Sequence, residues 1–542
     1  MAPPRGRCVL TELTLLIILP LLGALVVALL PKARTELVFP VAVGVSVLPL
    51  AASLWIMVNF VSGEPLFQFT EDYVLSDTFG IAWRLGVDGI SLWMIVLTGL
   101  LMTLAIAASK SITDRPKQYM VAMLVLEAGL LGVFLSLDLL LFFAFFEIVL
   151  VPMYLLIGIW GGENRAYASI KFVLFTAFGS IFLLVGIIFL AVTAGDAVGA
   201  PTSFDFRTML SLDLSSTTQL WLFLAFGIAF AIKVPLFPFH TWLPDAHTEA
   251  PTAGSVILAG VLLKMGAYGF LRFNLTLFPE AAVDLALIIG IIGVIGIIYG
   301  AAVAIVQPDV KRLVAYSSVS HMGFVMLGIF ALTSQGLSGG VFVMISHGLT
   351  TGALFLLIGM IYERRHTRLI ADYGGLAKVM PIYAGIFLFM AFASVGLPGL
   401  SGFVGEFAVL LGSYLTLPVL AIIAGSGVIL AAVYMLWAYE RIFTGPVTNP
   451  KNEGLSDLDF REIAILVPLI VLIVGIGVYP KPILDRIEPS VEIILDRIEA
   501  TTDYEAPEFG RVDEMVDPRD VVIESTGHDD DSGEHGDEEG SE

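Results

Sequence analysis

The stretch Ala225–Asp245 reads AFGIAFAIKVPLFPFHTWLPD, and it decides the fold. An apolar run ends at Lys233, and Pro235 and Pro238 follow directly. Because proline removes a backbone donor and clashes with the preceding turn, we predict a helix that breaks beside the lysine. At membrane depth the carbonyls freed by such a break must be satisfied by protein or by water in a cavity. A hydrated break beside an ionisable side chain is a good place to load or release a proton.

Similar apolar runs recur on both sides of this stretch, from Leu13 to Tyr479. Hydrophobic residues make up 57% of the 542-residue chain, charged residues make up 14%, and the mean hydropathy is +0.91. A water-soluble domain needs more surface charge, and the short alternating segments of a β-barrel are not found. We therefore predict an all-α, polytopic membrane helical bundle of about 14 transmembrane helices. The expected spans are residues 10–30, 38–60, 88–108, 119–136, 139–160, 172–195, 218–239, 253–273, 284–306, 314–333, 339–361, 381–411, 417–440 and 464–479.

The charges in the loops predict an orientation. One set of alternate loops holds 16 basic residues, and the other set, with the N-terminal arm, holds five. Cytoplasmic loops carry the excess of lysine and arginine, so the first set is expected on the cytoplasmic side and both termini outside. The first set is Lys32, Arg34, Lys110, Arg115, Lys117, Arg165, Lys171, Lys311, Arg312, Arg364, Arg365, Arg368, Lys378, Arg441, Lys451 and Arg461. The second is Arg5, Arg7, Arg84, Arg207 and Arg272.

The net charge of −21 is concentrated at the C-terminal end. Residues 481–542 contain 21 acidic and 5 basic side chains, and we predict an acidic, mostly disordered tail there. The remaining chain is nearly neutral, so nothing indicates nucleic-acid binding. The single cysteine, Cys8, excludes an internal disulfide, and no dinucleotide-binding or Walker motif is present. We expect no cofactor and no redox centre in this chain.

An internal repeat links two distant segments of the chain. Residues 179–186 resemble residues 352–359, at an offset of 173. The same offset takes Lys233 onto Glu406, and it takes Glu147 onto Ser320, the neighbour of His321. A five-helix repeat crosses the membrane an odd number of times, so the second copy is expected to be inverted, as is typical of transporters.

Six ionisable residues are expected at or near membrane depth, where an unpaired charge costs about 2.5–3.5 kcal/mol on insertion scales. Glutamate, lysine and histidine can each gain or lose a proton when burial moves their pKa towards neutrality. We predict a proton relay in which Glu147 and Lys233 form a pair; structural ion pairs and hydrogen-bonded histidines are the alternative. The relay residues are Glu147, Lys233, Lys264, His321, His347 and Glu406.

Two further segments bear on this hypothesis. The glycine-rich stretch Gly396–Glu406 predicts a second broken helix, in register with the first. Residues 240–254 join spans 7 and 8, and we interpret them as a polar connector with little helical regularity. Their His240, Asp245, His247 and Glu249 fit no standard metal-ligand spacing, so no metal site is predicted.

Three motifs resemble a known family. Phe146–Gly158, Lys233–Gly254 and Gly399–Glu406 look like the antiporter-like membrane subunits of respiratory complex I, NADH:quinone oxidoreductase. The resemblance covers roughly residues 70–445, and the acidic tail lies outside it. It implies three N-terminal spans (1–118), two inverted half-channels (119–273 and 284–440) with broken helices 7 and 12, and a last span (464–479).

The resemblance also implies roles. Glu147 and Lys233 would be the charged pair of the first half-channel, Lys264 the central lysine, and Glu406 the exit-side residue. His321 and His347 would connect them. In the family the sister subunits L and N usually carry lysine at the Glu406 position, so the resemblance implies that the glutamate distinguishes this chain from them. FMN, iron–sulfur clusters and quinone would be bound by partner subunits. The chain would then reside in a bacterial inner membrane, beside subunits L and N.

Two other functions remain open on the sequence alone. A subunit of a multisubunit cation/proton antiporter would share the same core. A structural membrane scaffold would move nothing, and loss of proton transport on changing Lys233 would exclude it.

Overall fold

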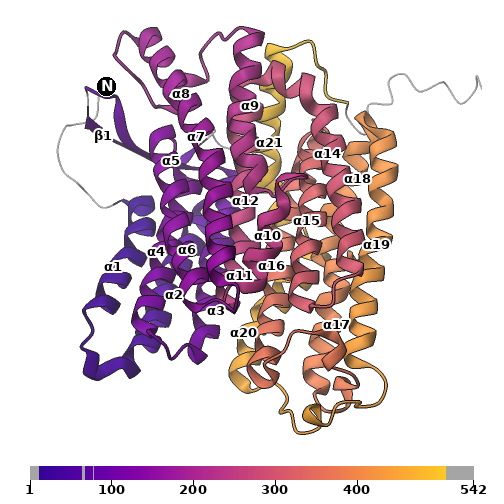
Figure 1. Ribbon diagram of the computed structural model, residues 1–542. Coiled ribbons are helices and arrows are strands. Elements are labelled where there is room, and N and C mark those ends of the chain that lie inside the picture. The colour runs from indigo at the N-terminus through magenta and orange to yellow at the C-terminus, as the bar shows by residue number, and fades with distance from the viewer. Residues whose placement is uncertain (1–10, 64–66, 77, 508–542) are drawn as a thin grey trace, which may run out of the picture. The chain divides into compact units, whose positions relative to one another are not determined.

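The computed structural model describes residues 11–63, 67–76 and 78–507, and helices dominate this part of the chain (Figure 1). The first half contains α1 (Glu12–Leu29), α2 (Val38–Asn59), β1 (Gln68–Ser76), β2 (Ile81–Val87), α3 (Gly89–Ala108), α4 (Pro116–Leu135), α5 (Leu139–Ile148), α6 (Leu150–Trp160), α7 (Arg165–Val198), α8 (Phe206–Met209), α9 (Ser216–Lys233) and α10 (Trp242–Glu249). The second half contains α11 (Thr252–Ile257), α12 (Leu263–Gly269), α13 (Leu275–Leu277), α14 (Pro279–Ile305), α15 (Val310–Ile329), α16 (Ser334–Arg365), α17 (Pro381–Val395), α18 (Ser401–Thr416), α19 (Pro418–Phe443), α20 (Phe460–Val478) and α21 (Lys481–Thr501).

The polytopic helical bundle is confirmed. In the described part of the chain, twelve helical runs are long and apolar enough to cross a membrane. The two other predicted spans coincide with α15 and with the pair α17 and α18. Serine, lysine and histidine lower the hydropathy of α15, and a break shortens the pieces of the pair. A criterion of length and hydropathy applied to single helices therefore leaves out the two spans that carry His321 and Glu406.

Both predicted helix breaks are present. Helix α9 ends at Lys233, and the chain resumes as a helix only at α10. The Trp242 indole donates to the Ile232 carbonyl at 2.9 Å, and the Leu236 N–H donates to the Ala231 carbonyl at 2.9 Å. Protein groups thus satisfy carbonyls that the prolines free. The second break separates α17 from α18, where Gly396 has a φ of +81° and ends α17.

The sequence missed an irregularity in the eighth span. Between α11 and α13 the helix widens twice into π-helical turns, at Leu258–Leu262 and Phe270–Asn274. Lys264 lies between them. Such turns leave backbone groups without their usual partner and are frequent at functional sites. Here the freed Ala259 carbonyl accepts a hydrogen bond from the Lys264 Nζ.

The all-α bundle carries one short addition, because β1 and β2 form a two-stranded antiparallel hairpin between α2 and α3. Two expectations need correction. Residues 240–254 are not an irregular connector, because Trp242–Glu249 form α10. The start of the expected disordered tail, Lys481–Thr501, is helix α21; the stretch from 508 onward lies outside the described residues. An amphipathic pattern explains α21, because Ile487, Val491 and Ile498 are fully buried on its inner side.

The core of the bundle is built around α16. Its central 18-residue window is completely buried, and the helix packs against α15, α18 and α11. In Figure 1, α10, α12 and α16 form the middle of the described bundle, with α1–α6 on one side and α17–α19 on the other. The side chains of Lys264, His321, His347 and Glu406 point into this interior and are buried.

Candidate functional site

Four of the six predicted residues form one line through the interior. Lys264 is fully buried, and its Nζ donates to Nδ1 of His347 at 2.7 Å. The rings of His347 and His321 lie 5.5 Å apart between centroids. A hydrogen bond of 2.8 Å joins His321 Nδ1 to Glu406 Oε1. All four side chains are at most 6% exposed, so the line is enclosed by protein along its length.

Close helix packing makes the first contact in this line possible. Gly260 lies in the π-helical turn before Lys264, and Gly348 follows His347. A Cβ on Gly348 would lie 3.0 Å from the Gly260 carbonyl and 2.7 Å from a methyl of Leu97. The absence of side chains at these glycines lets α16 approach the lysine-bearing helix closely enough for the hydrogen bond.

His321 is the branch point of the line. On its Nε2 side, Ser394 Oγ lies at 3.3 Å and the Tyr434 hydroxyl at 3.5 Å. A small cavity of about 10 Å³ adjoins this cluster and is lined by both histidines, Ser346, Ser394 and Glu406. That volume is comparable with the space that one water molecule needs. The site thus presents alternating proton donors and acceptors rather than a single ion pair.

The predicted pair in the first half does not form a contact. Lys233 is 1% exposed, and its Nζ has no hydrogen-bond partner among the described residues. The ammonium lies 4.7 Å from the centroid of the Phe146 ring and 5.8 Å from that of Phe172. Glu147 is half-buried, and its Oε1 also lacks a partner. Its charge acts on Lys233 through space, without an ion pair.

The helix that ends at the first break and the helix that carries the central lysine are in direct contact next to Lys264. Gly266, two residues further along α12, packs against α9, and a Cβ there would lie 2.6 Å from the Phe230 carbonyl. Phe230 is three residues before Lys233. The central lysine and the lysine at the helix break are therefore carried by helices that touch at this level of the bundle.

Several buried ionisable residues were missed by the sequence analysis. Glu127 is fully buried on α4 with neither carboxyl oxygen hydrogen-bonded within the described residues. It stands at the middle of the predicted fourth span, so the criterion that found Lys264 applies to it as well. Arg272 and Asp88 form a buried ion pair of 2.5 Å, which no local pattern predicts because 184 residues separate them.

The two carboxylates among the connector residues weighed as metal ligands have other partners. Asp245 forms ion pairs with Lys171 at 2.7 Å and with Arg312 at 3.6 Å. Glu249 accepts a hydrogen bond from the Asn164 N–H at 2.9 Å. Within the described residues, no group of three or more histidine, cysteine, aspartate or glutamate side chains is arranged to hold a metal ion.

Known proteins share both the sequence and the fold. Residues 136–431 match the family model of the NADH:quinone oxidoreductase/Mrp antiporter transmembrane domain. NADH-quinone oxidoreductase subunit M of Rhodobacter capsulatus is 46% identical over 505 residues, which cover 90% of this chain and 97% of that protein.

Solved structures agree with this assignment. A chain of respiratory complex I from Thermus thermophilus with bound NADH superposes with a TM-score of 0.81 at 34% identity, covering 90% of this chain and 99% of that one. A chain of the Mrp complex from Dietzia shares the fold, with a TM-score of 0.77 at 21% identity and coverages of 90% and 99%. The chain belongs to the subunit M family, the antiporter-like membrane subunits of NADH-quinone oxidoreductase in respiratory complex I.

Proposed function

We propose that this subunit translocates protons through the line Lys264–His347–His321–Glu406, with Glu147 and Lys233 controlling the first half of the path. The observation that carries the proposal is the continuity of the line. Hydrogen bonds of 2.7 Å and 2.8 Å flank a histidine pair, in an interior where unpaired charges are costly. A structural scaffold has no need of four ionisable groups in succession there.

Each group in the line can hold a proton in one state and accept one in another. The lysine amine and the two imidazoles exchange protons at nitrogen, and the Glu406 carboxylate exchanges them at oxygen. Glu147 lies near Lys233 without contacting it, so the Glu147 charge sets how strongly the lysine holds its proton. When a proton enters or leaves one group of the line, the change in charge alters the proton affinity of the neighbouring group.

The redox chemistry belongs to other subunits in this proposal. FMN, iron–sulfur clusters and quinone are bound by partners in the complex, among which we place the sister antiporter-like subunits L and N. The subunit acts as the translocase part of the enzyme, in the inner membrane of a bacterium. The positive loops, which include Lys311 and Arg368, face the cytoplasm, and both termini face outwards.

The proposal is tested with the assembled complex in inverted membrane vesicles. We expect Glu406→Gln to lower both NADH-driven proton uptake and coupled NADH:quinone activity several-fold, because the amide cannot take up a proton from His321. Glu440→Gln, on the same half of the chain, is the matched control and should behave as wild type. Unchanged pumping in assembled Glu406→Gln complex would refute the relay.

A further inference from the structure

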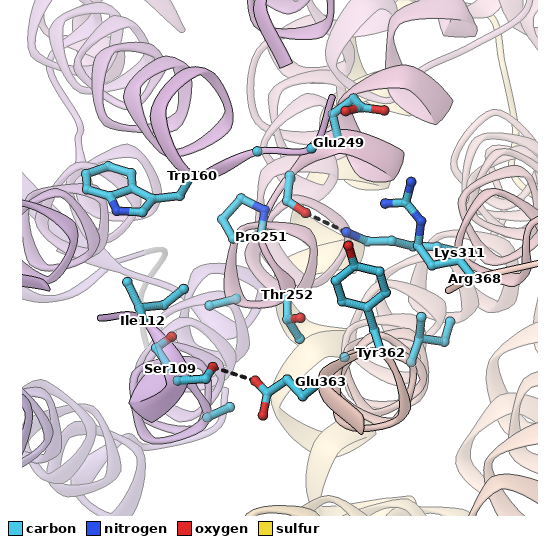
Figure 2. Close-up of a pocket in the computed structure, with 18 of the residues that line it drawn as sticks. Ser109, Ile112, Trp160, Glu249, Pro251, Thr252, Lys311, Tyr362, Glu363 and Arg368 are labelled. Carbon is cyan, nitrogen blue, oxygen red and sulfur yellow. Dashed lines mark hydrogen bonds between the residues drawn. The ribbon is translucent and has the colours of Figure 1, made fainter. Parts of the chain in front are cut away.

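A cavity lies at the face that we place on the cytoplasmic side (Figure 2). Its volume is about 220 Å³, and Glu249, Thr252, Lys311, Tyr362 and Arg368 are among the residues that line it. Figure 2 shows Lys311 reaching across to the backbone carbonyl before Pro251, and this contact is a hydrogen bond to Ala250. Lys311 is only 6% exposed, so its side chain forms part of the buried wall of the cavity.

Helices α10 and α16, which both reach this cavity, carry buried polar atoms without a hydrogen-bond partner in the described chain. The His247 ring is fully buried, and neither of its nitrogens has a hydrogen-bond partner within the described chain. The same holds for Thr351 Oγ1 and for His347 Nε2. Buried polar groups are normally hydrogen-bonded, and those without a protein partner are sites for ordered water.

Helix α16 arranges these groups in order. His347, Thr351, Phe355, Ile358 and Tyr362 follow one another at intervals of three or four residues, so they share one side of the helix. Fifteen residues separate the first from the last, which is about 22 Å along the axis at the helical rise. This side of α16 therefore runs from His347 to the cavity, where Ile358 and Tyr362 are lining residues.

His247 stands between the two ends. Its ring stacks on Phe355 with centroids 4.7 Å apart and an interplanar angle of 5°. At Lys233 the rings of Phe146 and Phe172 lie beside the ammonium, and none of the residues that line the cavity belongs to α9.

We propose that the cavity, His247 and Thr351 form a separate proton-uptake path, which delivers cytoplasmic protons directly to Lys264 and His347 without passing through Lys233. The inference rests on the proposed relay and specifies where its protons come from. Each step transfers one proton from a water or ring N–H to the next nitrogen or oxygen, and no other bond changes. Lys311 is a positioning residue, which holds the Ala250 carbonyl and keeps the cavity open beside His247.

The first experiment closes the cavity. Ile112 lines it and is partly exposed. In assembled complex with Cys8→Ala, Ile112→Cys is modified by a bulky maleimide from the cytoplasmic face of inverted vesicles, and NADH-driven proton uptake is measured. We expect modification to lower uptake several-fold. Gly454→Cys, at an exposed position of another loop on that face, and the Cys8→Ala background receive the same reagent and should be unaffected.

The second experiment removes the ring nitrogens. His247→Phe keeps the stacking on Phe355, and we expect about a tenfold loss of uptake, because a proton-transfer group is missing. Added imidazole should restore uptake in His247→Ala, which a merely structural defect would not allow. Lys264→Ala distinguishes failure of the relay from failure of the separate uptake path. Normal proton uptake in that variant would refute the relay itself. If Lys264→Ala is inactive while fully modified Ile112→Cys and His247→Phe both pump normally, the relay stands and the separate path is wrong.

Discussion

At the residue scale, Lys264 has an environment that disfavours a permanent charge. It is fully buried between two π-helical turns, and its amine is held by a backbone carbonyl and by one histidine nitrogen. None of the ion pairs within the described residues supplies it with a carboxylate. A permanently charged group there carries a large desolvation cost, so the amine is expected to give up its proton during part of the cycle.

This environment predicts the behaviour of two variants. Lys264→Ala should abolish coupled proton pumping or reduce it severely. Lys264→Arg should also impair it, because guanidinium keeps its proton at any accessible pH and cannot pass it on. Pumping is measured in vesicles, with assembly checked on native gels. Lys110→Arg, at an exposed position, is the control. Full pumping by Lys264→Arg would leave Lys264 as a structural charge.

Glu147 acts on Lys233 by charge alone, since no ion pair joins them. Glu147→Gln keeps the shape of the side chain and removes that charge. We expect coupled NADH:quinone activity to fall several-fold while the subunit still assembles. Glu163→Gln, at an exposed position between α6 and α7, is the matched control. Wild-type activity and pumping in Glu147→Gln would argue that the two residues are functionally independent.

At the element scale, the break between α17 and α18 is held by a close backbone approach. A Cβ on Gly402 would lie 2.2 Å from the Ala393 carbonyl, so α18 starts directly against the end of α17. Gly399 has a φ of +91° and open space around its Cα. The two glycines therefore serve different purposes. Gly402 permits the close contact of α18 with the end of α17, whereas Gly399 permits a backbone with positive φ.

Alanine substitutions at Gly402 and Gly399 distinguish the effect of the close contact from the effect of the backbone conformation. Gly402→Ala should push the two helices apart, displace Glu406 from His321 and lower coupled activity strongly. Gly399→Ala should cost only about 1–2 kcal/mol of backbone strain and leave most of the activity. Quinone reduction by NADH, normalised to assembled complex, measures the difference. Equal activities of the two variants would mean that the close approach at Gly402 does not position Glu406.

At the scale of the whole molecule, the distribution of charge predicts how the subunit sits in the membrane. The loops with 16 basic residues should face the cytoplasm, and the acidic C-terminal segment should face outwards. A cysteine replacing Ser532, in a Cys8→Ala background, should react with an impermeant thiol reagent added to intact spheroplasts. A cysteine replacing Gly454 should react only after the membrane is opened. The reverse pattern would overturn the orientation.

The sequence by itself determined the features that depend on neighbours along the chain. Apolar runs located the spans, because each must match the thickness of the bilayer core. Proline after Lys233 and glycine before Glu406 located the two breaks, because these residues act on their own turn of helix. Ionisable side chains within apolar runs identified the relay candidates. Glu127 met the same criterion and was overlooked, and the amphipathic pattern of α21 was hidden by the acidic charge around it.

Only the tertiary structure decided which of these residues meet. Lys264 and His347 are 83 residues apart, and His321 and Glu406 are 85 apart. Their contacts depend on how α12, α15, α16 and α18 pack, and on Gly260 and Gly348 at the closest approach. The same packing keeps Lys233 beside aromatic rings and out of contact with Glu147, although the sequence favoured a pair. Local patterns carry no information on such distances, because a helix presents the same face whatever lies opposite it.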